Sequence, residues 1–119
     1  MVSISKEEGD FHFEVEGLHK LWALKSQLKI PINNVIRAYQ DRESLNGWWK
    51  GIRMPGTHVP GIITAGTFYQ SGEKIFWDVV NKDNAIIIDL EDESYKKLII
   101  EVKNPLETID FINDGLEFV

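Results

Sequence analysis

The chain has 119 residues, a length that fits one domain spanning residues 1–119 with a core of its own. It contains no cysteine, which excludes disulfides, thiolate catalysis and cysteine metal sites and fits a reducing compartment. The net charge of −6 argues against nucleic acid as a partner and against bulk attraction to an anionic membrane, because both select basic surfaces.

The beginning of the chain does not resemble a secretory signal, because the charged residues Lys6-Glu7-Glu8 stand where an apolar segment should begin. No apolar run approaches the roughly 20 residues that a membrane-spanning helix needs. We therefore expect a cytoplasmic protein.

The charge is unevenly distributed along the chain. Residues 17–59 carry seven basic and two acidic side chains, whereas four lysines and ten acidic residues follow from Lys82 onward. Solvated faces of several strands explain such a distribution on base rates. A basic binding patch in the middle segment is the alternative, and it leaves contact with a membrane surface open.

Alternating apolar and polar residues predict two strands at the N-terminus, Val2–Ser5 and Phe11–Glu16, joined at Glu7–Asp10. The spacing of apolar residues in Gly17–Trp22 then suits a single helical turn.

Two further strands are predicted at Leu24–Ile30 and Asn34–Tyr39. Pro31 separates them, because proline cannot donate a hydrogen bond to a strand ladder. A long connection follows from Gln40 to Gly61.

Pro55-Gly56 and Pro60-Gly61 predict type II turns at the end of this connection, with proline presetting φ and glycine taking a positive φ. Gly66, inside the next strand, predicts a bulge or a tight bend. The regular spacing of turn residues after it predicts an antiparallel meander. Its four strands are Ile62–Tyr69, Lys74–Val80, Ala85–Leu90 and Lys96–Val102.

The last segment has the signals of a helix. Asn104 suits the N-cap, Pro105 the first helical position, and Glu107 stands where a capping box places it. The expected apolar stripe comprises Leu106, Ile109, Ile112 and Leu116, joined by Phe111 and Val119.

This order of elements resembles the bacterial pleckstrin-homology-like domains. The segments that carry the resemblance are Leu21–Ser26, Leu28–Ile32, Gly66–Phe68 and Phe76–Val79. The resemblance implies a mainly β fold of about seven strands, in two nearly orthogonal antiparallel sheets that form a partly open barrel capped by the helix. It also implies a binding or assembly module rather than a catalyst.

Two glycine-rich stretches, Gly51–Thr57 and Gly61–Thr67, match the glycine spacing of a nucleotide-binding loop. Both lack the lysine that reaches the phosphates, and neither opens a predicted helix, so the turn interpretation is favoured.

Histidines offer little catalytic or metal-binding chemistry. His12, Glu14, Glu16 and His19 form a conceivable metal set, but the wet face of any strand produces this spacing, so no metal site is predicted. His58 is predicted in a loop, where it is the best general base that the chain offers. No catalytic constellation is found, and we therefore expect a protein that is not an enzyme and needs no cofactor.

The strongest candidate for a ligand-binding or partner-binding site combines Trp48, Trp49, Lys50 and Arg53, with His58 nearby. Tryptophan and arginine are enriched at interface hot spots. The alternative is that the rings cover an open end of the barrel as core. The loop in which related domains bind phosphoinositides corresponds to Lys6–Asp10, and its acidic character departs from that pattern.

Three functional hypotheses follow. The first is a non-catalytic interaction module that binds a protein partner or associates with itself, through a sheet edge or the loop around Trp48 and Trp49. The second is a module that binds a lipid surface or a small ligand. The third is a small enzyme that uses His58.

Overall fold

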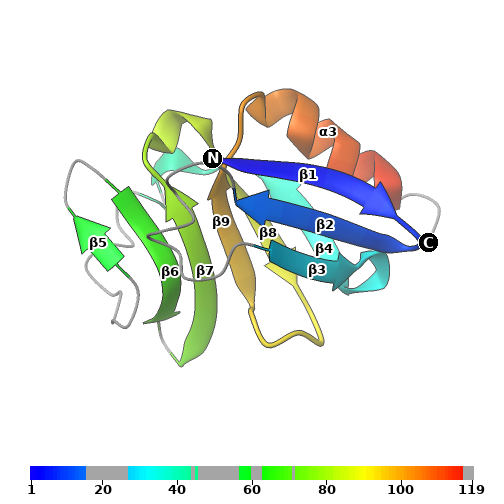
Figure 1. Cartoon of the computed structure of the whole chain (residues 1–119), viewed down its shortest axis with the longest axis horizontal. Helices are drawn as coiled ribbons and strands as arrows, with labels where there is room; N and C mark the ends of the chain where they lie inside the picture. The colour runs from blue at the N-terminus through cyan, green and yellow to red at the C-terminus, as the bar shows by residue number, and fades with distance from the viewer. Residues whose placement is uncertain (16–26, 44, 46–56, 60–62, 71, 117–119) are drawn as a thin grey trace.

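The computed structural model describes residues 1–15, 27–43, 45, 57–59, 63–70 and 72–116. Nine strands in this part form a three-stranded sheet, in the order β1-β2-β3, and a six-stranded sheet, in the order β4-β8-β9-β7-β6-β5. Figure 1 shows the two sets of strands crossing steeply, with helix α3 beside β1. The predicted mainly β fold with one C-terminal helix is confirmed, and the described sheets do not close into a barrel.

The N-terminal hairpin forms as predicted. Strand β1 (Val2–Glu7) pairs with β2 (Asp10–Val15) around a two-residue turn. Glu8 and Gly9 both have positive φ, 48° and 84°, which is the geometry of a type I′ turn and matches the twist of the two strands. Strand β3 (Gln27–Pro31) continues the sheet on the other side of β2.

Pro31 marks the change from one sheet to the other. It ends β3, the short 3₁₀ helix η1 (Ile32–Asn34) follows, and β4 (Val35–Tyr39) begins the six-stranded sheet. A proline at a strand end costs no ladder hydrogen bond, so the chain turns here at little cost. The predicted break is confirmed.

The remaining strands lie close to their predicted positions, with one addition. Strand β5 forms inside the segment predicted as a long connection and adds one strand to the eight predicted ranges. The bounds are β5 (Thr57–Val59), β6 (Ile63–Gln70), β7 (Glu73–Val79), β8 (Ala85–Leu90) and β9 (Lys97–Glu101), with the 3₁₀ helix η3 (Lys82–Asn84) before β8.

The predicted meander, and with it the all-antiparallel arrangement, is wrong at one point. Strand β9 lies between β7 and β8, and its pairing with β7 is parallel, with Ile75 opposite Lys97. The reason is burial. Four of the five residues of β9 are buried, so both faces of this strand are covered. A meander would leave β9 at the sheet edge, whereas a strand that is apolar on both faces belongs inside a sheet.

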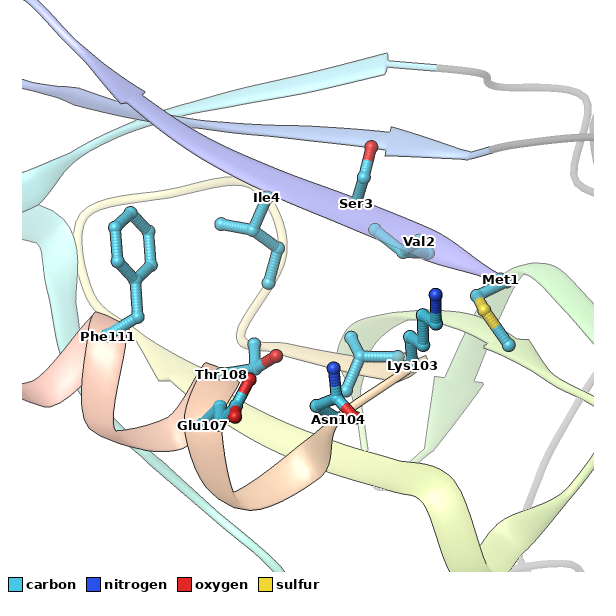
Figure 2. A pocket seen from close by; sticks show the side chains of 10 residues that line it. Met1, Val2, Ser3, Ile4, Lys103, Asn104, Glu107, Thr108 and Phe111 are labelled. Atoms are coloured by element: carbon cyan, nitrogen blue, oxygen red, sulfur yellow. The ribbon is translucent and has the colours of Figure 1, made fainter.

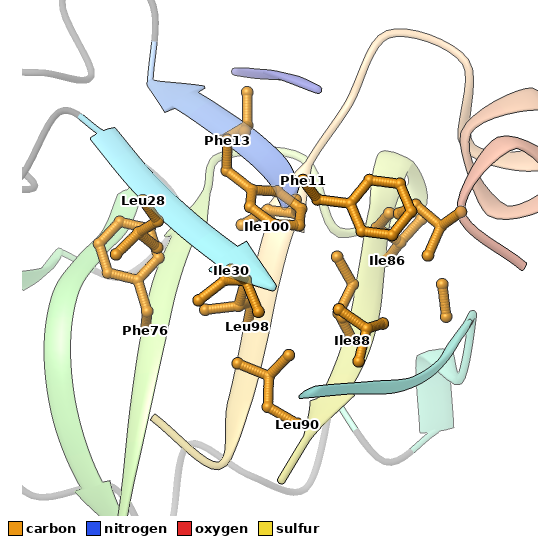
Figure 3. Close-up of a cluster of buried hydrophobic side chains, with 14 of the residues drawn as sticks. Phe11, Phe13, Leu28, Ile30, Phe76, Ile86, Ile88, Leu90, Leu98 and Ile100 are labelled. Atoms are coloured by element: carbon orange, nitrogen blue, oxygen red, sulfur yellow. The ribbon is translucent and has the colours of Figure 1, made fainter. Parts of the chain in front are cut away.

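The six-stranded sheet carries apolar residues on both faces. The inner core lies between the two sheets, where Phe11 and Phe13 of β2 meet Ile86 and Ile100 (Figure 3). The outer core lies on the opposite face and also contains Leu45 of the segment after β4. Its buried residues are Leu45, Phe68, Ile75, Trp77, Val79, Ala85, Ile87 and Ile99.

Helix α3 (Pro105–Leu116) begins where the sequence predicts, and the carbonyl of Asn104 accepts the first helical hydrogen bond, from the amide of Thr108. The helix packs against β4. There the side chain of Asn113 accepts from the backbone N–H of Ala38 at 2.9 Å and donates to its carbonyl at 3.0 Å. The helix thereby satisfies backbone groups at an outer sheet edge, which protects that edge from pairing with another strand.

The predicted apolar stripe of α3 needs one correction, because Leu106 is 72 % exposed. At about 100° per residue, Leu106 lies about 120° around the helix from the fully buried Ile112. It therefore points away from the sheets. Gly115 belongs to the buried face instead, and a Cβ there would lie 3.0 Å from Cζ of Phe11.

Candidate functional site

Most of the site predicted from sequence lies outside the described residues. This applies to Trp48, Trp49, Lys50 and Arg53, and to the turns at Pro55-Gly56 and Pro60-Gly61. The backbone of His58 belongs to β5 and is paired with Thr64 of β6, so the predicted loop position is wrong. Pairing with β6 gives this segment ladder hydrogen bonds that an isolated loop lacks.

The described part of the chain contains a groove between β1 and the first half of α3, with a volume of about 350 Å³. Figure 2 shows the strand on one side and the helix on the other, with side chains of both elements around the space between them. Ten residues line the groove: Met1, Val2, Ser3, Ile4, Val102, Lys103, Asn104, Glu107, Thr108 and Phe111.

One wall of the groove is a free strand edge, because β1 pairs only with β2 in the described sheet. In a hairpin with a two-residue turn, the two residues that flank the turn, here Glu7 and Asp10, exchange backbone hydrogen bonds. Along the two strands, hydrogen-bonded pairs of this kind alternate with pairs that exchange no hydrogen bonds. The backbone N–H and C=O groups of Val2, Ile4 and Lys6 therefore point away from β2. Within the described residues, no backbone hydrogen bond reaches these groups.

The middle of the groove is apolar. Ile4 is only partly buried, and Phe111 is 43 % exposed. The Phe111 ring meets Phe11 edge-on, with centroids 6.0 Å apart, so one side of it is held while the other faces outward. Figure 2 shows Phe111 and Ile4 next to each other between the helix and the strand. A small apolar side chain from another molecule finds contacts on both.

One end of the groove carries a positive charge, and a second lysine lies beyond the other end. Lys103 lies at the end where β1 begins, and Nζ of Lys6 lies 3.8 Å from the Cβ position of Gly115, in the last turn of α3. Among the described residues, neither lysine has an ion pair. The Met1 ammonium, in contrast, is 3.2 Å from the carboxylate of the fully buried Asp78, and this contact holds the start of β1 in place.

The conceivable metal set is not assembled in the described part of the chain, where no group of three potential ligands lies together. His12 is 4.0 Å from the carboxylate of Glu7, its neighbour across the hairpin. Glu16 and His19 lie outside the described residues.

A second polar cluster lies on the other side of the molecule, at the border of the outer core. Asp89 accepts hydrogen bonds from Lys97 at 2.5 Å, from Arg37 at 3.1 Å and from Tyr39 at 3.1 Å. Burial by itself raises the pKa of Asp89, but the hydrogen bonds from Lys97, Arg37 and Tyr39 outweigh it and hold the pKa below its ordinary value of 3.8. These contacts join β4, β8 and β9, so the cluster has a structural role.

Asp89→Asn is expected to lower the free energy of unfolding by about 1 to 2 kcal/mol at pH 7, because charged hydrogen bonds are lost at a partly exposed site. The pKa of Asp89 is depressed in the folded state, so its contribution is present above about pH 4 and is lost as the pH falls through the folded value. Urea unfolding at pH 6 and near pH 2.5 should therefore show a smaller difference between wild type and variant in acid. A difference that stays constant would contradict this account, and Asp83→Asn, in an exposed ion pair with Arg42, is the control.

Comparison with protein-family models, with curated proteins and with solved structures found no match. The resemblance to bacterial pleckstrin-homology-like domains therefore stays a prediction. No helix among the described residues has the length and apolar character that crossing a membrane requires.

Proposed function

We propose that this protein is a non-catalytic interaction module that binds a segment of a partner protein at the free edge of β1. One observation carries the proposal: the outward backbone groups of Val2 and Ile4 lie at a groove, those of Lys6 continue the same strand edge, and no described residue pairs with them. An added strand satisfies such groups, and main-chain hydrogen bonds then supply much of the affinity.

The treatment of another edge strengthens this interpretation. At β4 the chain covers the outer edge with α3 and satisfies Ala38 through the side chain of Asn113. At β1 the same helix stands back and leaves a groove of about 350 Å³. Proteins normally block or cover exposed strand edges, so an edge left open beside a groove is a place where pairing is tolerated.

A partner segment fits this site better than a second copy of the domain. The groove beside β1 has a volume of only about 350 Å³, which suits a short segment better than a folded domain. The sheet of a second copy would extend further and meet the helix, which runs alongside β1 (Figure 1). We therefore expect a monomer in solution, and light scattering measures this directly.

The expected affinity is modest. A single strand in this groove forms an interface well below the roughly 1,200 Å² of stable protein complexes, so dissociation constants in the micromolar range are expected.

Lys6→Pro is the sharpest test of edge pairing. Proline removes the outward N–H of this residue, whereas Lys6→Ala removes the same side chain and keeps the N–H. The Lys6 side chain is exposed, so replacing it with proline or alanine removes no buried contact. Proline is tolerated at a strand-edge position whose N–H points away from the sheet. We expect peptides selected on the wild-type protein from a displayed library of short random sequences to bind Lys6→Ala, and to bind Lys6→Pro about tenfold more weakly or worse.

Thermal unfolding establishes first that both variants are folded. Equal binding to Lys6→Pro and Lys6→Ala would overturn edge pairing, as would a library that yields no binder. If Lys6→Pro does not fold, Thr108→Trp is the alternative variant, because it fills the groove from the helix side, and Thr108→Ser is its control. Peptide binding that is unaffected by Thr108→Trp would also overturn edge pairing.

The other hypotheses stay predictions. A lipid-surface or small-ligand module depends on a basic middle segment that lies partly outside the described residues, and the enzyme hypothesis depends on His58, for which no neighbouring base or nucleophile is described. No observation favours either of them over the groove.

A further inference from the structure

We infer that the segment recognised at β1 has an apolar residue at its centre and acidic residues two positions away on each side. This inference rests on the proposed function and adds the chemistry of the partner. It follows from three features: the register that β1 imposes, the apolar middle of the groove, and the two lysines, Lys103 at one end and Lys6 beyond the other.

The register follows from the hairpin. An incoming antiparallel strand that pairs with the outward groups of Val2, Ile4 and Lys6 places one of its own residues opposite each of them. These three incoming residues share one face of the new strand, because side chains alternate along a strand with a period of two. They stand two positions apart, and their face is the one that looks into the groove with Ile4.

The central position is apolar because of what surrounds it. The residue opposite Ile4 meets that partly buried side chain and the exposed side of the Phe111 ring, with Thr108 between them on the helix. The space is at the small end of ligand pockets, which start near 300 Å³, so it accommodates an aliphatic side chain together with the backbone that carries it. A carboxylate at this position would face Glu107 on the same wall and be repelled.

The flanking positions are acidic because each lies next to a lysine. The residue opposite Lys6 is its direct cross-strand partner, and opposite charges favour such pairs. The residue opposite Val2 lies at the end of the groove where Lys103 stands. The Met1 ammonium at that end is already held by Asp78, so among the described residues that line the groove Lys103 is the cation that remains for a ligand.

A second copy of β1 does not satisfy this pattern. In an antiparallel self-pairing centred on Ile4, Lys6 of each strand lies opposite Val2 of the other, which brings a third positive charge toward Lys103 instead of a carboxylate. Charge therefore argues for a partner segment, in agreement with the position of α3.

The test uses the full chain and a fluorescent capped peptide with leucine at its centre, glutamate two residues away on each side and threonine elsewhere. At low salt we expect it to bind at least tenfold more tightly than the same peptide with lysine in place of both glutamates. The preference should shrink at high salt, since exposed charges are screened. A peptide with aspartate in place of the leucine should bind more weakly than the parent.

The charge reversal Lys6→Glu with Lys103→Glu should invert the preference between the acidic and the basic peptide. Lys29→Glu with Lys96→Glu is the matched control, because it changes the net charge equally at exposed positions away from the groove. The control should keep the wild-type preference. Equal affinity of wild type for both peptides, or a preference that the Lys6 and Lys103 variant retains, would overturn the inference.

Failure of this inference is distinguishable from failure of the proposed function. If the acidic peptide does not bind but library-selected peptides bind and lose affinity in Lys6→Pro, the recognition pattern is wrong while edge pairing stands. If neither kind of peptide binds, both are wrong.

Discussion

Phe11→Ala is expected to lower the free energy of unfolding by about 3 to 5 kcal/mol, as truncation of a fully buried phenylalanine does. Phe11 lies where three elements meet. Its ring packs against Phe13 on its own strand, against Phe111 edge-on, and so close to Gly115 that a Cβ there would lie 3.0 Å from its Cζ atom. Removing the ring leaves a cavity beneath α3 that the helix cannot fill without losing its contacts with β4.

Urea unfolding of wild type and variant measures this effect. Typical domains have a stability of 5 to 15 kcal/mol, so this loss is a large part of the total and should move the unfolding midpoint to a clearly lower urea concentration. Phe111→Ala is the control: its ring is 43 % exposed, and we expect a loss less than half as large. A loss below about 1 kcal/mol for Phe11→Ala would show that α3 does not depend on this contact.

Gly66→Val is expected to cost about 3 kcal/mol or more, through two separate effects. Gly66 has a φ of 104° on strand β6, a conformation that a β-branched residue adopts only with a strain of about 1 to 3 kcal/mol. Gly66 is also buried, so the added methyl groups overpack the sheet at a further cost of about 1 to 3 kcal/mol. The predicted bend in this strand thus has a backbone basis, although the pairing with β7 continues through Trp77 without a bulge.

Gly72→Val separates the two effects. Gly72 has a φ of 80°, but its Cβ position has no atom within 4 Å, so only backbone strain applies there. The melting temperature of Gly66→Val should therefore fall clearly further than that of Gly72→Val. An equal fall in melting temperature for the two variants would mean that the residues around Gly66 move to accommodate the added methyl groups. An unchanged melting temperature would contradict the predicted backbone strain.

Local structure was largely predictable because its causes are local. The structure reproduces the strand Val2–Ser5, the strand from Phe11 as far as the described residues reach, the turn at Glu7–Asp10 and the break at Pro31. The strand Ala85–Leu90 and the helix start at Pro105 agree with their predicted bounds. Steric limits on proline, the capping of helix ends and the period of side chains along a strand act within a few residues, so the sequence alone shows them.

The candidate groove was not predicted, since none of its defining properties is local. Phe111 was counted with the apolar stripe of the helix, yet its position at the margin of that stripe leaves it half-exposed beside Ile4. The two residues are more than a hundred positions apart, and no periodicity connects them. The only sequence signal for the groove was that Phe111 does not share the helical spacing of Ile109, Ile112 and Leu116.

What the sequence determined about this protein is the identity of its elements: a mainly β chain with a hairpin at its beginning and one helix near its end. What only the tertiary structure decided is their arrangement. Strand β9 enters between β7 and β8 because it is buried on both faces, and α3 covers the edge of β4 while leaving that of β1 open. Both outcomes depend on burial and hydrogen bonding between distant segments, and a sequence pattern records only which residues seek burial, not which partner provides it.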